Sequence, residues 1–331
     1  MAHDVRPHHF RPPEFRMIET NGIRLRAAIC GEGPLIVLVH GFPESWYSWR
    51  HQMGPLSAAG FTACAIDVRG YGGSDKPGAV EDYDMRAMTG DVAGVIDALS
   101  PDAPAIIIGH DWGAPIVWHA ALLHPEKFRA VAGLSVPWTG YSATPFIDIM
   151  RAIYTERGKF FYQIYFQDEG VAEAELEADV RGALRRTYYM ACGDAPDLML
   201  AEKTVHDTFL TGLPDPQPFP AWLSEADIDY FTHEFERSGF RGALNRYRNF
   251  HRDHAFMAGR ADYTIRQPAL FIGGERDPVL RMAPGADLMA GMRGNMADLR
   301  GAHIIPGIGH WTQQEAPDET TGLLIDWLAT L

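Results

Sequence analysis

Short apolar runs, separated by stretches long enough for a helix, constrain the fold of this chain most. They read PLIVLVH (34–40), FTACAID (61–67), APAIIIG (103–109), AVAGLSV (130–136) and PALFIGG (268–274). Runs that are apolar on both faces and alternate with helical segments, such as 81–99, are typical of a parallel sheet covered on both sides. An earlier stretch, residues 17–30, predicts two alternating strands joined by a turn at Asn21-Gly22.

The strand rhythm stops between about residues 138 and 258. Helical segments follow one another there, at 145–167, 172–191 and 225–250, and a proline-rich loop, TGLPDPQPFPAW, interrupts them. Because the strand pattern resumes at Pro268, we interpret this block as a helical cap inserted into a sheet domain. The expected division is 1–137 for the first part of the core, 138–258 for the cap and 259–331 for the second part of the core.

Charge and cysteine content exclude several classes of protein. With 29 Lys and Arg against 43 Asp and Glu, the formal net charge is −14, which disfavours binding to nucleic acid or to anionic lipid. The three widely spaced cysteines indicate reduced thiols and a cytoplasmic location. No apolar run approaches the ~20 residues of a membrane span. His8 and His9 lie in a Pro/Arg-rich arm, where solvated side chains are more plausible than a metal site.

The stretch GHDWG places Asp111 directly after the expected strand at 103–109. It matches the G-x-S-x-G pattern of a sharp strand-to-helix turn that exposes a nucleophile, with aspartate in place of serine. Ligands of open parallel sheets bind at the carboxyl ends of the strands, where Asp111 is expected. The alternative for this motif alone is an aspartate that caps the following helix.

Several motifs together carry a resemblance to a known family. They are HGFPESWYSWR (40–50), DVRGYGGSD (67–75), GHDWGA (109–114), FYQIYFQ (161–167), GFRGALNRYRNF (239–250), GGERD (273–277) and GHWTQQEAP (309–317). In this order they resemble the epoxide hydrolases of the α/β-hydrolase fold, over nearly the whole chain after the first 15 or so residues. The resemblance implies a mostly parallel sheet flanked by helices, with a helical cap.

The resemblance also implies a catalytic triad: Asp111 as the nucleophile, His310 as the base and Asp277 as the partner of His310. Each of these last two has a structural alternative, because His310 could be a buried core histidine and Asp277 a turn residue before Pro278. The resemblance further implies that the backbone N–H groups of Phe42 and Trp112 form an oxyanion hole.

Within the HGFPE stretch the resemblance implies a cis peptide bond between Phe42 and Pro43. His40, Gly41 and Pro43 are expected to support the site. His40 and Glu44 are expected to make local hydrogen bonds.

An ionised aspartate, with a reference pKa of about 3.9, can attack an sp³ carbon and form an ester that water then cleaves. Epoxides and alkyl halides both suit this chemistry, but only the epoxide leaves a basic alkoxide that needs an acid. Tyrosine can supply that proton. Eight of the twelve tyrosines lie in residues 138–258, and the resemblance selects Tyr162 and Tyr247, with Tyr165 as the alternative to Tyr162.

The sequence therefore predicts an epoxide hydrolase that takes a small-molecule epoxide and water, with no metal and no organic cofactor. A haloalkane dehalogenase is the nearest alternative, although Phe42 stands where those enzymes usually carry a halide-binding group such as Asn. Fluoroacetate-type relatives carry arginines just after the nucleophile, and this chain has none there. A non-catalytic ligand sensor on the same fold is a third alternative.

Two further points stay open at the level of sequence. Exposed cap surfaces often pair in such proteins, so a homodimer is allowed. Arg246 departs from the family pattern, which often has an aromatic residue before the second cap tyrosine, and this alters the expected shape and polarity of the cap.

Overall fold

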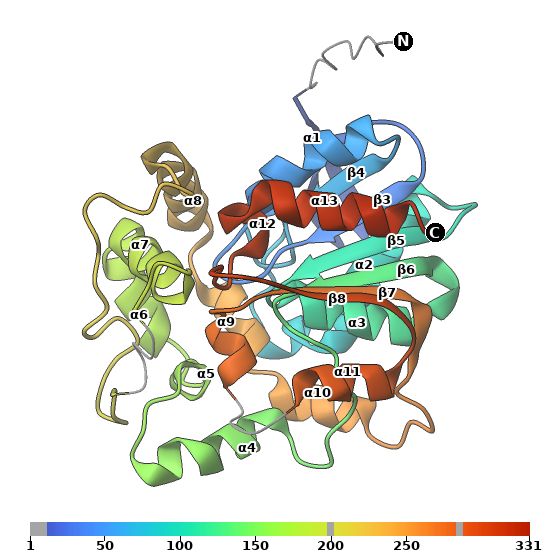
Figure 1. Ribbon diagram of the computed structural model, residues 1–331. Coiled ribbons are helices and arrows are strands. Elements are labelled where there is room, and N and C mark those ends of the chain that lie inside the picture. Colours follow the sequence, from blue (N-terminus) through green and yellow to red (C-terminus); the bar gives the residue numbers. More distant parts are fainter. Residues whose placement is uncertain (1–11, 197–201, 283–286) are drawn as a thin grey trace.

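The computed structural model describes residues 12–196, 202–282 and 287–331 (Figure 1). Within them, eight strands form one sheet in the order β1-β2-β4-β3-β5-β6-β7-β8. The strands are β1 (Glu14–Thr20), β2 (Ile23–Cys30), β3 (Leu35–Val39), β4 (Thr62–Ile66), β5 (Ala105–His110), β6 (Phe128–Leu134), β7 (Ile265–Gly274) and β8 (Met296–Ile305). From β4 to β8 every neighbouring pair is parallel, whereas β1 and β2 are antiparallel additions. The predicted α/β-hydrolase architecture is confirmed.

The strands follow the apolar runs of the sequence. The predicted hairpin joins β1 and β2, and Asn21 (φ 46°) and Gly22 (φ 77°) form its two-residue turn. Strand β8 does not coincide with any of the five apolar runs of the sequence. It lies at the edge of the sheet and most of its residues are partly or fully exposed, so its sequence lacks a continuous apolar stretch.

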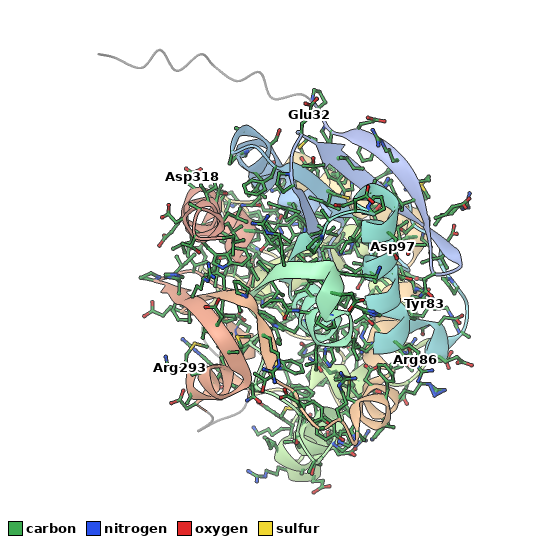
Figure 2. All side chains as sticks on the ribbon, turned by 90° about the vertical axis from the view of Figure 1, so that its right-hand side faces the viewer. Glu32, Tyr83, Arg86, Asp97, Arg293 and Asp318 are labelled. Atoms are coloured by element: carbon green, nitrogen blue, oxygen red, sulfur yellow. The ribbon has the colours of Figure 1, made fainter. Side chains whose placement is uncertain are left out.

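Helices cover both faces of the sheet (Figures 1 and 2). Helices α1 (Arg50–Ala58) and α13 (Pro317–Leu328) pack on one face, and α2 (Met85–Leu99) and α3 (Gly113–Leu123) on the other. Alternate residues of β3 point to opposite faces of the sheet. Ile36 packs on the side covered by α1 and α13, and Val37 packs on the side covered by α2 and α3. Both faces of β3 are therefore buried, as a continuous apolar run requires.

The helical block between β6 and β7 lies beyond the carboxyl ends of the parallel strands (Figure 1). It contains α4 (Phe146–Ile153), α5 (Tyr162–Tyr165), α6 (Val171–Ala178), α7 (Val180–Ala191), α8 (Glu225–Ser238), α9 (Arg241–Tyr247) and α10 (Phe250–Met257). Each of the three expected helical segments is broken. The breaks lie at Gly158 and Gly239, which have positive φ, and at Asp179, which caps α7. The exact domain boundaries stay a prediction.

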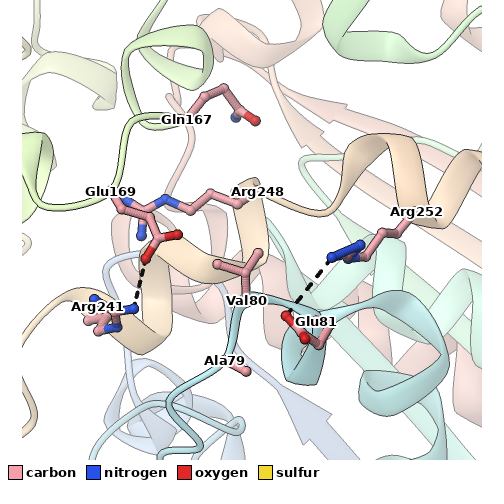
Figure 3. Close-up of a pocket in the computed structure, with 8 residues that line it drawn as sticks. All are labelled: Ala79, Val80, Glu81, Gln167, Glu169, Arg241, Arg248 and Arg252. Carbon is pink, nitrogen blue, oxygen red and sulfur yellow. Dashed lines mark hydrogen bonds and ion pairs between the residues drawn. The ribbon is translucent and has the colours of Figure 1, made fainter.

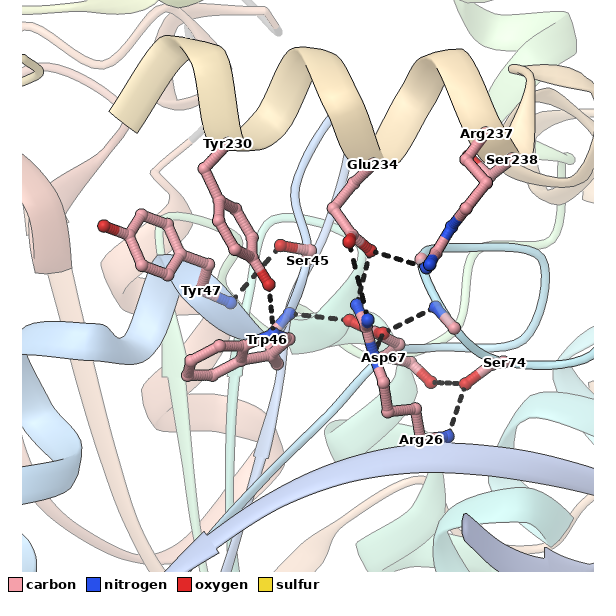
Figure 4. Close-up of polar contacts among 12 residues, drawn as sticks. Arg26, Ser45, Trp46, Tyr47, Asp67, Ser74, Tyr230, Glu234, Arg237 and Ser238 are labelled. Atoms are coloured by element: carbon pink, nitrogen blue, oxygen red, sulfur yellow. Dashed lines mark hydrogen bonds and ion pairs between the residues drawn. The ribbon is translucent and has the colours of Figure 1, made fainter. Parts of the chain in front are cut away.

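A buried ionic cluster connects the cap to the core (Figure 4). Arg26 on β2 donates from Nε to Asp67 at 2.5 Å and also pairs with Glu234 on α8. The Asp67 carboxylate further accepts the backbone N–H groups of Trp46 at 3.0 Å and Gly73 at 2.9 Å. The conspicuous DVRGYGGSD stretch thus contributes to fixing the cap.

A second connection is at the surface (Figure 3). It involves the 3-10 helix η2 (Val80–Tyr83), where Glu81 lies 3.9 Å from Arg252 of α10. Beside it, Arg241 and Glu169 of the cap pair at 2.8 Å. These residues line a pocket of about 480 Å³ in which the arginines face acidic partners.

None of the described helices is long and apolar enough to cross a membrane. Cys30, Cys64 and Cys192 are buried free thiols. His8 and His9 lie outside the described residues.

Candidate active site

Asp111 occupies a tight turn between β5 and α3, with φ at 50°. The close approach of the two elements requires glycine on both sides. A Cβ on Gly109 would lie 2.2 Å from the carbonyl oxygen of Gly113, and one on Gly113 would lie 2.0 Å from that of Val39. The residue that caps α3 is Trp112, without a side-chain bond, so the alternative role of Asp111 as a helix cap is wrong. Its carboxylate instead points to Phe42 and His310.

The structure brings His310 and Asp277 to this carboxylate. Nε2 of His310 lies 3.3 Å from Oδ2 of Asp111, and its Nδ1 lies 3.0 Å from both oxygens of Asp277. Asp277 is fully buried and also accepts the N–H of Val279 at 2.8 Å, so it holds the turn as well as the imidazole. The three side chains come from the ends of β5, β7 and the loop after β8, which meet at one edge of the sheet.

Burial alone would lower the pKa of His310, but the carboxylates of Asp277 and Asp111 raise it well above its usual value. The two neighbouring carboxylates therefore favour the charged form of the imidazole. If Asp111 became an uncharged ester, one of the two anions would disappear and the pKa of His310 would fall. Reaction at Asp111 would thus favour the neutral imidazole, the form that can accept a proton.

The backbone N–H of Phe42 donates to Oδ1 of Asp111 at 2.7 Å, and the Phe42–Pro43 bond is cis. A Cβ on Gly41 would lie 2.3 Å from the same Oδ1, so only glycine allows this approach. Trp112, the second expected donor, is the next residue after Asp111.

Supporting contacts surround the HGFPE loop. His40 Nδ1 lies 2.8 Å from the Gly41 carbonyl oxygen and its Nε2 accepts the N–H of Val68 at 3.0 Å. Glu44 accepts the N–H of Gly41 at 2.8 Å. The local roles expected for His40 and Glu44 are therefore present, and they fix the loop that carries Phe42.

The sequence analysis gave no role to His110, which lies between the HGFPE loop and His310. Its Nδ1 lies 2.8 Å from Glu44 and its Nε2 lies 2.8 Å from the carbonyl oxygen of His310. Burial alone would raise the pKa of Glu44, yet His110 and the neighbouring donors lower it to about 2. The imidazole of His110 is thus held between the Glu44 carboxylate and the His310 carbonyl oxygen.

Glu315 was also missed. It accepts the backbone N–H groups of Gly193, Gly309 and Trp311, at 2.7, 3.0 and 2.9 Å, and so clamps the loop that carries His310 against the end of α7. Glu315 belongs to the GHWTQQEAP stretch, but its contact with Gly193, 122 positions away, leaves no pattern in the sequence.

The two cap tyrosines face the same carboxylate. The rings of Tyr162 and Tyr247 lie 6.2 Å apart, and Tyr247 also contacts the rings of Phe42 and Trp112. Burial, and after it the charge of Asp111, raises the pKa of both hydroxyls, so both stay protonated at neutral pH. The Tyr162 hydroxyl accepts from Gln163 Nε2 at 2.7 Å.

Tyr165, the alternative to Tyr162, belongs to another environment. Burial and a hydrogen bond with Glu175 raise the pKa of its hydroxyl, and Asp111 does not contribute. Elsewhere in the described residues, no group of three or more His, Cys, Asp or Glu side chains is arranged to hold a metal ion.

Comparison with known proteins agrees with this geometry. Residues 34–317 match the family described as alpha/beta hydrolase fold. The chain is 42% identical over 326 residues to Epoxide hydrolase A of Mycobacterium tuberculosis (strain ATCC 25618 / H37Rv), covering 96% of this chain and 98% of the relative.

Solved structures give the same result. An epoxide hydrolase from an endophytic Streptomyces superposes with a TM-score of 0.91 at 44% identity, covering 96% of both chains. Epoxide Hydrolase A from Mycobacterium thermoresistibile gives a TM-score of 0.88 at 43% identity, covering 96% of this chain and 98% of that one. The fold and the matches together define an α/β-hydrolase. Within that fold, this chain belongs to the epoxide hydrolases.

Proposed function

We propose that this protein converts an epoxide and water into a vicinal diol through a covalent ester on Asp111. One observation carries the proposal. The nucleophile is a carboxylate whose two oxygens have different partners, with Oδ1 on the Phe42 N–H and Oδ2 facing His310. Oδ2 is then the oxygen that attacks carbon, and Oδ1 stays behind as the ester carbonyl.

In the first step, Oδ2 bonds to one epoxide carbon and the C–O bond of the ring breaks. Tyr162 and Tyr247 hold the epoxide oxygen and give it a proton as the alkoxide forms. Their protonated hydroxyls are suited to this, and well-placed acid catalysis contributes on the order of 10²–10⁴ in rate.

After ester formation, His310 loses its own proton, which neutralises the tyrosinate left by the first step. In the second step, the neutral His310 removes a proton from water, and the water oxygen attacks the carboxyl carbon of Asp111. The N–H groups of Phe42 and Trp112 stabilise the charge that develops on Oδ1. When the tetrahedral centre collapses, the bond between the carboxyl carbon and Oδ2 breaks and the diol leaves with Oδ2. The proton that His310 collected from water goes to the departing oxygen, and the proton released by the new Asp111 carboxyl group returns to His310.

A single-turnover reaction in H₂¹⁸O with excess enzyme tests this scheme. We expect the label in the peptide that contains Asp111 and an unlabelled diol from the first turnover. Label that goes directly into the diol would show that water, and not Asp111, opens the ring.

The alternatives give different products. A haloalkane dehalogenase would release halide, and a ligand sensor would bind without turnover. A panel of styrene-type, terminal aliphatic and disubstituted epoxides, assayed for diol beside a halide-release assay, separates all three. A homodimer, a cytoplasmic location and a cap that spans 138–258 also stay predictions; sedimentation, cell fractionation and limited proteolysis test them in turn.

A further inference from the structure

Arg246 is a buried cation next to the catalytic groups, and the proposed mechanism does not use it. Arg246 is 2% exposed and lies on α9 directly before Tyr247. A buried charge is costly unless it is paired, so its contacts indicate what it does for the molecule.

The guanidinium group joins the cap to the core. Nη1 donates to the backbone carbonyl of Tyr83 at the end of η2, and Nη2 pairs with Asp253 of α10. The other oxygen of Asp253 accepts the N–H of Met85, the first residue of α2, at 2.6 Å. Residues 83–85 of the core therefore hold Arg246 and Asp253 as one unit.

The same guanidinium group packs on Trp112. Its central carbon lies 4.7 Å from the centroid of the Trp112 ring, in the range of a cation–π contact. Its Nε has no hydrogen-bond partner among the described residues, so hydrogen bonding alone does not account for its position. Trp112 follows the nucleophile and supplies an expected oxyanion N–H.

The indole of Trp112 also contacts Tyr247. The two rings meet edge to face with centroids 5.2 Å apart, and a hydrogen bond from the Trp112 side chain acts on the Tyr247 hydroxyl. The ring of Phe250 also contacts Trp112, and the two ring centroids lie 5.6 Å apart. Arg246 thus fixes both the ring of Trp112, the residue after Asp111, and helix α9, which carries the proposed acid Tyr247.

We propose that Arg246 is a positioning residue that fixes Tyr247 and Trp112 relative to Asp111, and so determines which epoxide carbon is attacked. The inference rests on the proposed function. The two carbons of an unsymmetrical epoxide compete for the same Oδ2, and the direction from which the tyrosine hydroxyls hold the oxygen selects between them.

The test compares Arg246→Met, which keeps length and removes charge, with Arg246→Lys, which keeps the charge but not the planar group. Asp253→Asn removes the ionic partner. Arg252→Gln is the matched control, since Arg252 is a half-exposed arginine on α10 that faces Glu81 of the same η2 segment at 3.9 Å (Figure 3).

Each variant turns over one enantiomer of styrene oxide in H₂¹⁸O for many cycles, and the position of the label in the diol gives the ratio of attack at the two carbons. Single-turnover kinetics gives the rate of ester formation. Loss of folded protein lowers the yield without altering this ratio, so the ratio separates positioning from a purely structural role.

We expect Arg246→Met to shift the ratio several-fold and to slow ester formation about tenfold to a hundredfold, because small misplacements of reacting groups have effects of this size. Arg246→Lys should recover part of both effects, and Asp253→Asn should shift the ratio in the same direction. Arg252→Gln should match the wild type.

An unchanged ratio and ester-formation rate in folded Arg246→Met would overturn the inference. If that variant does not fold, an unchanged ratio in both Arg246→Lys and Asp253→Asn would overturn it. Failure of the proposed function is distinguishable, because the wild type would then form no diol and no ester at Asp111.

Discussion

The Nε2 atom of His310 lies 3.3 Å from the Oδ2 atom of Asp111, so the proposed nucleophile and the proposed base are in direct contact. Contact between an imidazole and two carboxylates favours the charged imidazole. In the proposed mechanism the Asp111 carboxylate reacts first. The loss of its negative charge then lowers the pKa of His310, so that the imidazole can act as a base.

Replacement of Asp111 with Asn should lower the pKa of His310, because it removes one of the two anions that raise it. NMR titration of the histidines, with His310→Gln to assign the signal, measures the change. An unchanged His310 titration in Asp111→Asn would contradict the coupling between the two groups.

The raised pKa also predicts how stability depends on pH. The folded protein binds the His310 proton more tightly than the unfolded chain, whose histidine titrates at about 6.5. The stabilisation is therefore complete below that pH and is lost as the pH rises through the folded-state pKa. Denaturation midpoints should show this loss at a lower pH in Asp111→Asn than in the wild type.

Replacement of His310 with Gln should leave ester formation intact and block its hydrolysis. Glutamine cannot accept the proton of water, whereas Asp111 and both cap tyrosines remain in place. Intact-protein mass spectrometry should show enzyme plus substrate, and peptide mapping should place the adduct on Asp111. Rapid, complete turnover by this variant would remove His310 from the second step.

Replacement of both Tyr162 and Tyr247 with Phe should reduce ester formation by about 10²–10⁴, the usual contribution of a general acid. Circular dichroism should show an intact fold, because the rings remain. Tyr165→Phe is the control, since Asp111 does not act on that hydroxyl. Full activity in the double variant would exclude the tyrosines from the mechanism.

Replacement of Gly41 with Ala should reduce activity at least tenfold to a hundredfold, because the new Cβ would lie 2.3 Å from Oδ1 of Asp111 and displace it. Gly78→Ala is a matched control, as a Cβ there would meet nothing within 4 Å. Equal activity of the two variants would show that the loop can move away without loss of the Phe42 contact.

Replacement of Glu234 with Gln should lower the free energy of unfolding by about 1.5–3 kcal/mol, the value of a hydrogen bond to a charged group. Glu234 is 5% exposed and binds Arg26 of the core. Glu14→Gln, in the exposed Glu14–Arg16 pair, should change little because solvent screens it. Urea denaturation of both variants measures the difference; equal midpoints would show that the buried pair does not stabilise the cap.

The sequence by itself determined the sheet, because strands buried on both faces need continuous apolar runs. It also determined the sharp turn at Asp111, since glycines 109 and 113 are a steric requirement of the turn and appear in the chain. Edge strand β8 has no continuous apolar run, because exposure of much of its length removes that signal.

Only the tertiary structure decided which polar groups meet. His110 reaches the His310 carbonyl across 200 positions of sequence, and Arg246 meets Tyr83 across 163. Such contacts depend on how the strand ends and the cap are arranged in space, and neither periodicity nor spacing along the chain records that arrangement. The residues around Asp111 that indicate a nucleophile are neighbours in the sequence and could be recognised there. The groups that set the geometry of the site come from distant positions and could not.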